Sequence, residues 1–381
     1  MVKRQYWVNR LEQQWRRRSV LWLRGVRRAG KTSLARSLPD VEYLDCELPR
    51  VRRLVEDPEA FLRELGRRRV VLDEIHRLPD PSELLKIAAD HFPATRVLAT
   101  GSSTLGASRR FRDTLAGRKT ELWLTPMIEA DRADFGGASF EQRLLRGGLP
   151  PFFLSPEPPE RDFQEWMDAY WAKDIQELFR LERRVTFQRF VELLLVQSGG
   201  VFEATRFAGP CEVSRTTITN YLAVLEATSV ALVLRPFSSR RGNEIIAAPK
   251  VYGFDTGFVC AHRGWSSLRP ADRGHLWEHY VLNELSARLQ ATSLRYWRDK
   301  QGHEVDLVWT PRAGPPVAIE CKWSARDVDL ANLKVFSRAY PQAELRVVAQ
   351  DADPGFVLER EGMAVRCVSL AGLVAELGLE T

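Results

Sequence analysis

Four residues stand at the spacing of a phosphate-binding loop: Gly25, Gly30, Lys31 and Thr32, in the stretch LRGVRRAGKTSLARSL. Glycines let backbone N–H groups turn toward phosphate oxygens, and the N-terminus of a following helix adds positive potential. Lys31 can then reach the terminal phosphates of a nucleotide, and Thr32 can bind its Mg²⁺ ion. We therefore predict an ATP site that comprises Gly25, Gly30, Lys31, Thr32 and Ser33, with ATP and Mg²⁺ as cofactors.

A second group of polar residues follows two further apolar stretches. RRRVVLDEIHRL places Asp73 and Glu74 at the end of its apolar run, and TRVLATGSSTL places Ser102 shortly after its own. We expect Asp73 to hold Mg²⁺ through water, and Glu74 to orient and activate the water that attacks the γ-phosphate. Ser102 can hydrogen-bond to the γ-phosphate or to that water; a helix cap is the alternative interpretation.

Arg118 precedes a further strand in the stretch LAGRKTELWLTP. The order of phosphate loop, Asp-Glu strand, polar strand end and then this arginine resembles the AAA+ ATPases. In that family an arginine at this place can reach the nucleotide of a neighbouring subunit and stabilise charge on the transferred phosphoryl group. The resemblance gives Arg118 that role in trans and implies a homo-oligomer, such as a ring. An ordinary surface arginine is the alternative.

The C-terminal third carries a separate set of acids with a lysine. Asp306 begins a strand in HEVDLVW, and Glu320 and Lys322 lie two residues apart in PVAIECKWS, so they share one face of a strand. Asp306 and Glu320 can converge on one or two Mg²⁺ ions, with Glu278 from the preceding helix and the main-chain carbonyl of Cys321 as further ligands. Lys322 can orient or activate water for phosphodiester cleavage.

This arrangement resembles the PD-(D/E)xK nuclease superfamily, which includes restriction enzymes and Holliday-junction resolvases. The sequence departs from the family pattern because Val305, not proline, precedes Asp306. A charged surface hairpin is one alternative, and a nuclease fold with a silent site, used for DNA binding or assembly, is another. His275 and His279 lie one helical turn apart and could be imagined in a zinc site without an obvious third ligand, and His303 could contact a scissile phosphate.

The middle of the chain predicts a helix, a turn and a second helix, followed by two short β runs. Ser214 is a good N-cap, and Ile218, Leu222 and Leu225 form one apolar face of the second helix. The arrangement resembles a winged helix-turn-helix, whose second helix enters the major groove while the wing contacts the backbone. We predict DNA contacts at Arg215, Thr217, Asn220, Arg240 and Arg241; a protein-docking or oligomer role is the alternative.

These elements predict an α/β chain in four parts. We expect an AAA+ P-loop core over residues 1–125, a helical lid over 126–185, a winged helix over 186–255 and a restriction-endonuclease-like α/β domain over 270–381. Phrases such as GSSTL, LAGR, RGGLP, HEVDLV and AIECK carry a resemblance to bacterial and archaeal AAA+ proteins over nearly the whole chain.

Composition narrows the possible classes of protein but does not select one of them. The 381 residues carry a formal net charge of +6, which suits an anionic partner but is also common in proteins with none. The five cysteines show no C-x-x-C spacing, which argues against a structural zinc site or a disulfide framework. No apolar run reaches 18 residues and the N-terminus has no signal core, so we expect a cytoplasmic protein with no membrane partner.

Three functions remain open at this level. The first is an ATP-hydrolysing protein that remodels or translocates duplex or branched DNA, as in repair or recombination, with possible Mg²⁺-dependent cleavage. The second is a nucleotide switch whose nuclease-like domain only binds DNA or a protein. The third is a DNA-binding regulator that uses ATP to oligomerise. Stimulation of ATP turnover by DNA separates the first from the second, because a translocase must couple its two sites.

Overall fold

The computed structural model describes residues 2–101, 114–137, 139–156, 160–179, 181, 183–238, 248–290, 293–360 and 362–380. The chain forms two units. Unit 1 comprises Met1–Arg143, Gly147–Arg184 and Tyr221–Val230, and unit 2 comprises Leu144–Arg146, Val185–Asn220 and Ala231–Thr381. Ser102, Arg240 and Arg241, which were predicted as site residues, lie outside the described residues.

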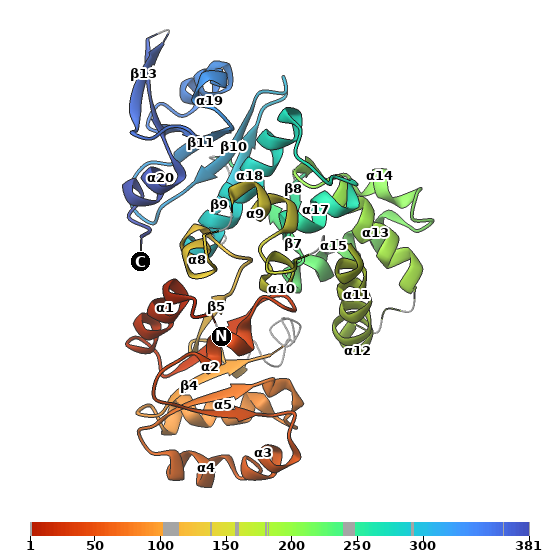
Figure 1. The fold of residues 1–381 in the computed structure, drawn as a ribbon, viewed down its shortest axis with the longest axis vertical. Helices are drawn as coiled ribbons and strands as arrows, with labels where there is room; N and C mark the ends of the chain where they lie inside the picture. Colours follow the sequence, from red (N-terminus) through yellow and green to blue (C-terminus); the bar gives the residue numbers. More distant parts are fainter. Residues whose placement is uncertain are drawn as a thin grey trace. The chain divides into compact units, whose positions relative to one another are not determined.

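Unit 1 is built on a five-stranded parallel sheet with the strand order β2-β3-β4-β1-β5 (Figure 1, red to yellow). Its strands are β1 (Val20–Arg24), β2 (Val41–Asp45), β3 (Arg69–Asp73), β4 (Arg96–Thr100) and β5 (Lys119–Trp123). This sheet matches the P-loop AAA+ core that the sequence predicted. In a parallel sheet all the strands end at one edge, so the residues that follow β1, β3 and β4 are brought to the same place.

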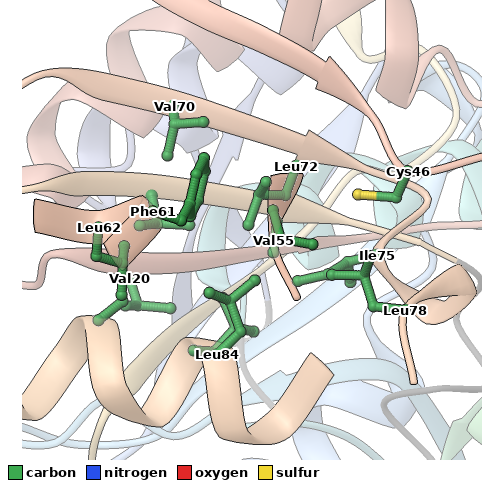
Figure 2. Packing of buried hydrophobic residues seen from close by; sticks show 14 of the residues in the cluster. Val20, Cys46, Val55, Phe61, Leu62, Val70, Leu72, Ile75, Leu78 and Leu84 are labelled. Carbon is green, nitrogen blue, oxygen red and sulfur yellow. The ribbon is translucent and has the colours of Figure 1, made fainter. Parts of the chain in front are cut away.

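Nearly all residues of β1, β3 and β4 are buried. Because successive side chains of a strand alternate between the two faces of the sheet, both faces are apolar here. Val20, Trp22, Val70, Leu72 and Val97 point into one core cluster with residues from three helices. Figure 2 shows part of that cluster, in which Phe61 and Leu62 lie beside strand residues. The three helices are α3 (Pro49–Leu54), α4 (Pro58–Leu65) and α5 (Pro81–His91), the last after a 3₁₀ turn, η1 (Ile75–Arg77). The intervening strand residues are also buried and face the other side, where α1 (Gln5–Trp15) and α2 (Lys31–Arg36) contact the strands.

A helical segment follows the sheet, where the sequence predicted a lid. Its elements are α8 (Glu129–Asp134), α9 (Phe140–Arg146), α10 (Pro150–Phe153), α11 (Glu160–Tyr170), η2 (Trp171–Ile175) and α12 (Gln176–Phe179). One continuous helix runs through α11, η2 and α12, and η2 is a π-helical turn in its middle. The turn carries Asp174, which is buried.

Unit 2 contains a small antiparallel sheet with the order β6-β8-β7. The elements of this middle region are α13 (Arg184–Val196), β6 (Gly200–Val201), α14 (Ala204–Ala208), α15 (Arg215–Ala227), β7 (Ala231–Leu234), β8 (Lys250–Gly253) and α17 (Thr256–His262). The second half of α15, from Tyr221, belongs to unit 1. The helices and the two β runs lie close to where the sequence predicted them. The segment between β7 and β8 would be the wing, and most of it lies outside the described residues.

The C-terminal part of unit 2 is a mixed sheet with the order β13-β14-β12-β11-β10-β9 (Figure 1, cyan to blue). Its elements are α18 (Pro270–Leu289), β9 (Leu294–Arg298), β10 (Glu304–Trp309), β11 (Val317–Lys322), η3 (Ala325–Asp327), α19 (Ala331–Ala339), β12 (Glu344–Ala349), β13 (Phe356–Arg360), β14 (Met363–Val368) and α20 (Leu370–Glu376). Among the described residues, no helix is long and apolar enough to cross a bilayer.

A buried ion pair joins distant segments of unit 1. The guanidinium of Arg4 donates to both carboxylate oxygens of Asp131, and the two side chains are only 3% and 0% exposed. Arg4 also donates to the carbonyl of Ala29 at 2.9 Å, and Asp131 accepts from the backbone N–H of Ile128 at 3.0 Å. The N-terminal helix, the phosphate loop and α8 are therefore held together by one pair of charges.

Removing one partner of this pair would leave a buried charge without compensation. We expect Asp131→Ala to lower the free energy of unfolding of unit 1 by about 3–5 kcal/mol. The matched control is Glu59→Ala, which breaks an exposed Glu59–Arg63 pair and should cost less than about 1 kcal/mol. Urea denaturation of both variants measures the difference, and equal losses would show that the buried pair has no special weight.

Candidate active site

The phosphate loop connects β1 to α2, and two of its glycines have a structural reason to be glycine. A Cβ on Gly25 would lie 2.6 Å from the carbonyl oxygen of Leu124, just past the end of the neighbouring strand β5. Gly30 has a φ of 95°, in the left-handed region that side chains disfavour, immediately before the first residue of α2. The loop can therefore turn tightly into the helix, as the sequence predicted.

Lys31 lies against the inner side of its own loop. Its Nζ donates to the carbonyls of Gly25 at 2.8 Å and Val26 at 3.1 Å. Burial lowers the pKa of this ammonium, while the charge of Glu74 acts in the opposite direction. The lysine is thus placed at the loop with a carboxylate nearby.

Asp73 and Glu74 end β3 beside the loop. Asp73 is 3% exposed and accepts hydrogen bonds from the hydroxyls of Thr100 and Tyr43. Glu74 has a φ of 53°, and its Oε2 lies 3.1 Å from Nδ1 of His76. Burial works to raise the pKa of Glu74, but the bond to His76 and the charge of Lys31 leave that pKa below its usual value. Glu74 is therefore a carboxylate at neutral pH, the form in which it can accept a proton.

These residues line one cleft of about 490 Å³, a volume within the usual range for a small-molecule site. Its lining includes Gly25, Gly30, Lys31, Thr32, Ser33, Asp73 and Glu74, which are the predicted ATP-site residues of the loop and of β3. The donor set fits Mg²⁺-ATP, because a lysine and a helix N-terminus face two acids and a hydroxyl. Thr32 and Asp73 would hold the metal, whose charge would offset that of the phosphates.

Thr100 occupies the strand-end position next to the cleft acids. The sequence predicted that a polar residue after strand β4 would hydrogen-bond to the γ-phosphate or the attacking water, and Ser102 was that residue. The structure describes Thr100, whose hydroxyl bonds to Asp73 and accepts from the backbone N–H of Glu74 at 3.3 Å. Thr100 therefore orients the carboxylate of Asp73 and holds the backbone at Glu74.

Arg27 and Asp174 are cleft residues that sequence reasoning missed. Arg27 Nε donates to Asp174 Oδ2 at 2.7 Å, which joins the phosphate loop to the π-helical turn η2. Asp174 is four residues after Tyr170, in phase with the apolar face of α11. A charged residue on an apolar helix face was a signal that it has a buried partner.

Arg118 lies at the N-terminal ends of the strands, opposite the end that carries the phosphate loop. It directly precedes β5, and its Nε donates to both carboxylate oxygens of Asp90 at 2.8 and 2.9 Å. It lines a separate basic cleft of about 310 Å³ together with Arg17, Arg18 and Arg96. Arg118 is therefore not among the residues that line the cleft of Lys31.

The predicted DNA-contact residues that the structure describes are on α15. Arg215 and Asn220 are exposed, and Thr217 is partly exposed, with its backbone N–H donating to Ser214 Oγ at 3.1 Å. Ile218 is buried, as the predicted apolar face requires. The polar face at the start of α15 is thus open to a partner.

The structure brings two of the C-terminal acids together. Asp306 and Glu320 lie one step beyond the Leu307–Ile319 pair of the antiparallel strands β10 and β11, so they oppose each other. An extra residue in β10 opposite β9, between Val305 and Val308, forms a bulge at Asp306. Asp306 Oδ2 accepts from the backbone N–H of Cys321 at 2.8 Å.

Glu320 is buried, and its Oε1 accepts from Lys322 Nζ at 3.0 Å. Its Oε2 is a buried oxygen with no hydrogen-bond partner among the described residues. Burial raises the pKa of both Glu320 and Asp306, and for Asp306 the charges of Glu278 and Glu320 raise it further. The three residues predicted on β10 and β11 therefore do share one site.

Glu278, the further metal ligand that was predicted, is bound by side chains outside that group. Its Oε1 accepts from Lys250 Nζ at 2.8 Å and from the hydroxyl of Tyr252. In the part of the chain that the structure describes, no three His, Cys, Asp or Glu side chains are grouped to hold a metal ion. The three-carboxylate arrangement therefore does not fit a metal, because a lysine already binds one of its members.

The histidines do not supply a substitute. Burial and the charge of Arg263 lower the pKa of His275 to about 4. His279 is buried beside the ring of Tyr252, with ring centroids 5.7 Å apart. His303 bonds to Asp299 at 2.7 Å. The zinc site that could be imagined from residues 275 and 279 is not among the described groups.

Comparison with known families covers three successive segments. Residues 17–130 match an AAA domain, residues 137–269 a domain of unknown function (DUF8612) and residues 273–367 another (DUF4143). The uncharacterized proteins Rv2008c of Mycobacterium tuberculosis and Mb2031c of Mycobacterium bovis are each 30% identical over 336 residues, which cover 84% of this chain and 74% of theirs. The chain belongs to the family of these mycobacterial proteins.

Among solved structures, this family member resembles the Walker-type ATPase PABY2304 of Pyrococcus abyssi. The sequences are 16% identical, the match covers 69% of this chain and 96% of the other, and the TM-score is 0.45. The AAA domain and the parallel sheet identify the N-terminal part of this family member as a P-loop ATPase of the AAA+ type.

Glu74 gives a test of the cleft chemistry. We expect Glu74→Gln to bind ATP with nearly normal affinity but to lower kcat by about 10²-fold or more, because the amide cannot accept a proton from water. The control is Glu47→Gln, an exposed residue that lines the same cleft. Phosphate release and binding of a fluorescent ATP analogue give the two values. Retention of half the turnover by Glu74→Gln would show that another group is the base.

Proposed function

We propose that this protein is an oligomeric ATPase that acts on duplex or branched DNA, with each nucleotide site completed by Arg118 of a neighbouring subunit. The observation that carries the proposal is that Lys31 and Arg118 lie at opposite ends of the strands of one parallel sheet. Lys31 follows the C-terminal end of β1, whereas Arg118 precedes the N-terminal end of the neighbouring strand β5.

Strand pairing gives the separation. Val20 pairs with Lys119 and Arg24 with Trp123, so β1 and β5 run side by side over their full length. The loop follows Arg24, whereas Arg118 precedes Lys119. Five residues of extended strand span about 16 Å, which exceeds the reach of an arginine side chain. Within one subunit Arg118 cannot contact the phosphates of the same cleft, so the proposal assigns it to another copy.

Asp90 supports this assignment because both of its carboxylate oxygens accept from Nε of Arg118. This charge-assisted contact limits the conformations of the arginine side chain. Arg118 Nη1 also donates to the carbonyl of Thr114 at 3.3 Å. An arginine held in this way loses less conformational freedom when it meets a phosphate.

The cleft residues divide the work of ATP hydrolysis. Lys31 binds the terminal phosphates, and Thr32 and Asp73 hold the metal. Glu74 accepts a proton from the attacking water, and Thr100 keeps Glu74 and Asp73 in place. Arg118 of the neighbour stabilises the charge that develops on the transferred phosphoryl group.

The case for DNA comes from α15 and from charge. Its first turns present Arg215, Thr216 and Asn220 to solvent, while Ile218 is buried beneath them. Helix, turn, helix and a three-stranded antiparallel sheet follow the order of a winged helix, in which a helix like α15 enters the major groove. A net charge of +6 favours association with a polyanion.

Mixing two inactive variants tests the trans site. Arg118→Ala should lower ATP turnover by about 10³-fold or more, and Lys31→Ala should abolish it. Mixed subunits would pair an intact nucleotide cleft with an intact Arg118, so turnover should rise well above the sum of the separate variants. Arg17→Ala, at an exposed arginine in the same basic cleft, is the control and should keep wild-type turnover. No recovery on mixing would contradict a site shared between subunits.

DNA dependence is tested by turnover with single-stranded, duplex, forked and four-way-junction DNA. We expect at least one form to stimulate the ATPase and to name the substrate. Arg215→Ala should weaken its binding by roughly tenfold or more, the ~1–3 kcal/mol typical of one arginine contact. Arg338→Ala removes an exposed arginine on α19 and should leave binding unchanged. Turnover indifferent to every DNA would refute the DNA part and favour a nucleotide switch.

A further inference from the structure

Lys250 is the cation at the centre of the C-terminal acids. It lies on β8, and its side chain is 4% exposed. Nζ donates to Glu278 Oε1 at 2.8 Å and to Glu304 Oε1 at 2.7 Å, so it joins α18 to the first residue of β10. These contacts are all within unit 2, and β8, α18 and β10 are labelled in Figure 1.

Aromatic rings complete the surroundings of this ammonium. Tyr252, two residues further on the same face of β8, has its ring centroid 5.7 Å from Nζ, and Tyr296 of β9 has its own 6.0 Å away. The Tyr252 hydroxyl donates to the same Glu278 oxygen that Lys250 contacts. Two acceptor carboxylates and two ring faces thus hold a single positive charge in a fixed place.

A buried ammonium needs this many partners, because an unpaired charge away from water is very costly. The two carboxylates among these partners are ligands of the kind that a divalent cation would use. Glu278 comes from the helix that the sequence predicted as the source of a metal ligand, and Glu304 is two residues before Asp306. A divalent ion bound through Glu278 would lie beside the ammonium and be repelled by it.

We propose that Lys250 takes the place of a metal ion at the Glu278 side of the C-terminal site, so that this domain assembles no three-carboxylate Mg²⁺ centre. Asp306 and Glu320 remain a pair served by the Cys321 N–H and by Lys322. The domain therefore has a nuclease-like arrangement of acids without metal-dependent strand cleavage. This inference is independent of ATP hydrolysis in unit 1.

Mn²⁺ titration of the nucleotide-free full chain, followed by electron paramagnetic resonance, tests the proposal. Wild-type protein should give the same Mn²⁺ binding as Glu278→Gln and Asp306→Asn. Lys250→Met removes the ammonium and frees the carboxylates of Glu278 and Glu304. This variant should gain one Mn²⁺ site that binds at least tenfold more tightly than any wild-type site in unit 2. The gained site should be lost in Lys250→Met/Glu278→Gln. Lys300→Met, at an exposed lysine of the same domain, should gain nothing.

Thermal unfolding gives a second readout. Loss of the ammonium should lower the Tm of Lys250→Met, and Mn²⁺ should restore part of that loss while leaving the wild-type Tm unchanged. Wild-type binding of Mn²⁺ that disappears in Glu278→Gln would overturn the proposal, and this arm needs no Lys250 variant to fold. A folded Lys250→Met that gains no site would also overturn it, as would Mg²⁺-dependent DNA cleavage by wild type that is lost in Asp306→Asn.

Discussion

The ion pair between Arg4 and Asp131 is the interaction on which the nucleotide site depends. Both charged side chains are buried, so water cannot solvate either charge if its partner is removed. Because Arg4 also bonds to the carbonyl of Ala29, the shape of the phosphate loop is linked to a helix before the sheet and to a helix after it. The loop is thus held by a side chain that lies outside it in the sequence. Its glycines therefore need not provide that support and can adopt the backbone conformation that a ligand requires.

The same device recurs at two other places. Arg27 and Asp174 join the phosphate loop to η2, and Lys250 joins Glu278 to Glu304 in unit 2. In each case a charged side chain is withdrawn from water and meets a partner far away in the chain. Apolar packing supplies most of the stability of such units, but these pairs decide which segments meet, because an alternative arrangement would leave a charge alone.

Sequence alone predicted the parts of the site that depend on local spacing. Gly25 to Thr32 form a loop between a strand and a helix, and Asp73 and Glu74 end an apolar strand, so both could be placed without a structure. Asp306, Glu320 and Lys322 were placed for the same reason, since strand alternation puts them on one face. The strands β1, β3, β4 and β5 followed from the same apolar runs, whereas β2 was not predicted.

The residues that escaped prediction share a different property. Arg4, Asp174 and Lys250 act through partners 127, 147 and 28 residues away, and no local pattern gives the identity of a distant partner. Asp174 and Lys250 did carry a weaker signal, because Asp174 lies on the apolar face of its helix and Lys250 lies among apolar strand residues. Glu278 was predicted as a metal ligand without its contact to Lys250, which no local pattern revealed.

The π-helical turn at Trp171–Ile175 has a consequence for how this chain can vary. An α-helix advances about 100° per residue, so one residue more or less rotates everything beyond that point to a new side. The wider turn absorbs one extra residue and lets the helix continue in the same direction. A deletion of a single codon there would keep a regular helix but would turn Asp174 or its neighbours away from Arg27. The length of this segment is therefore as much a part of the nucleotide site as its side chains are.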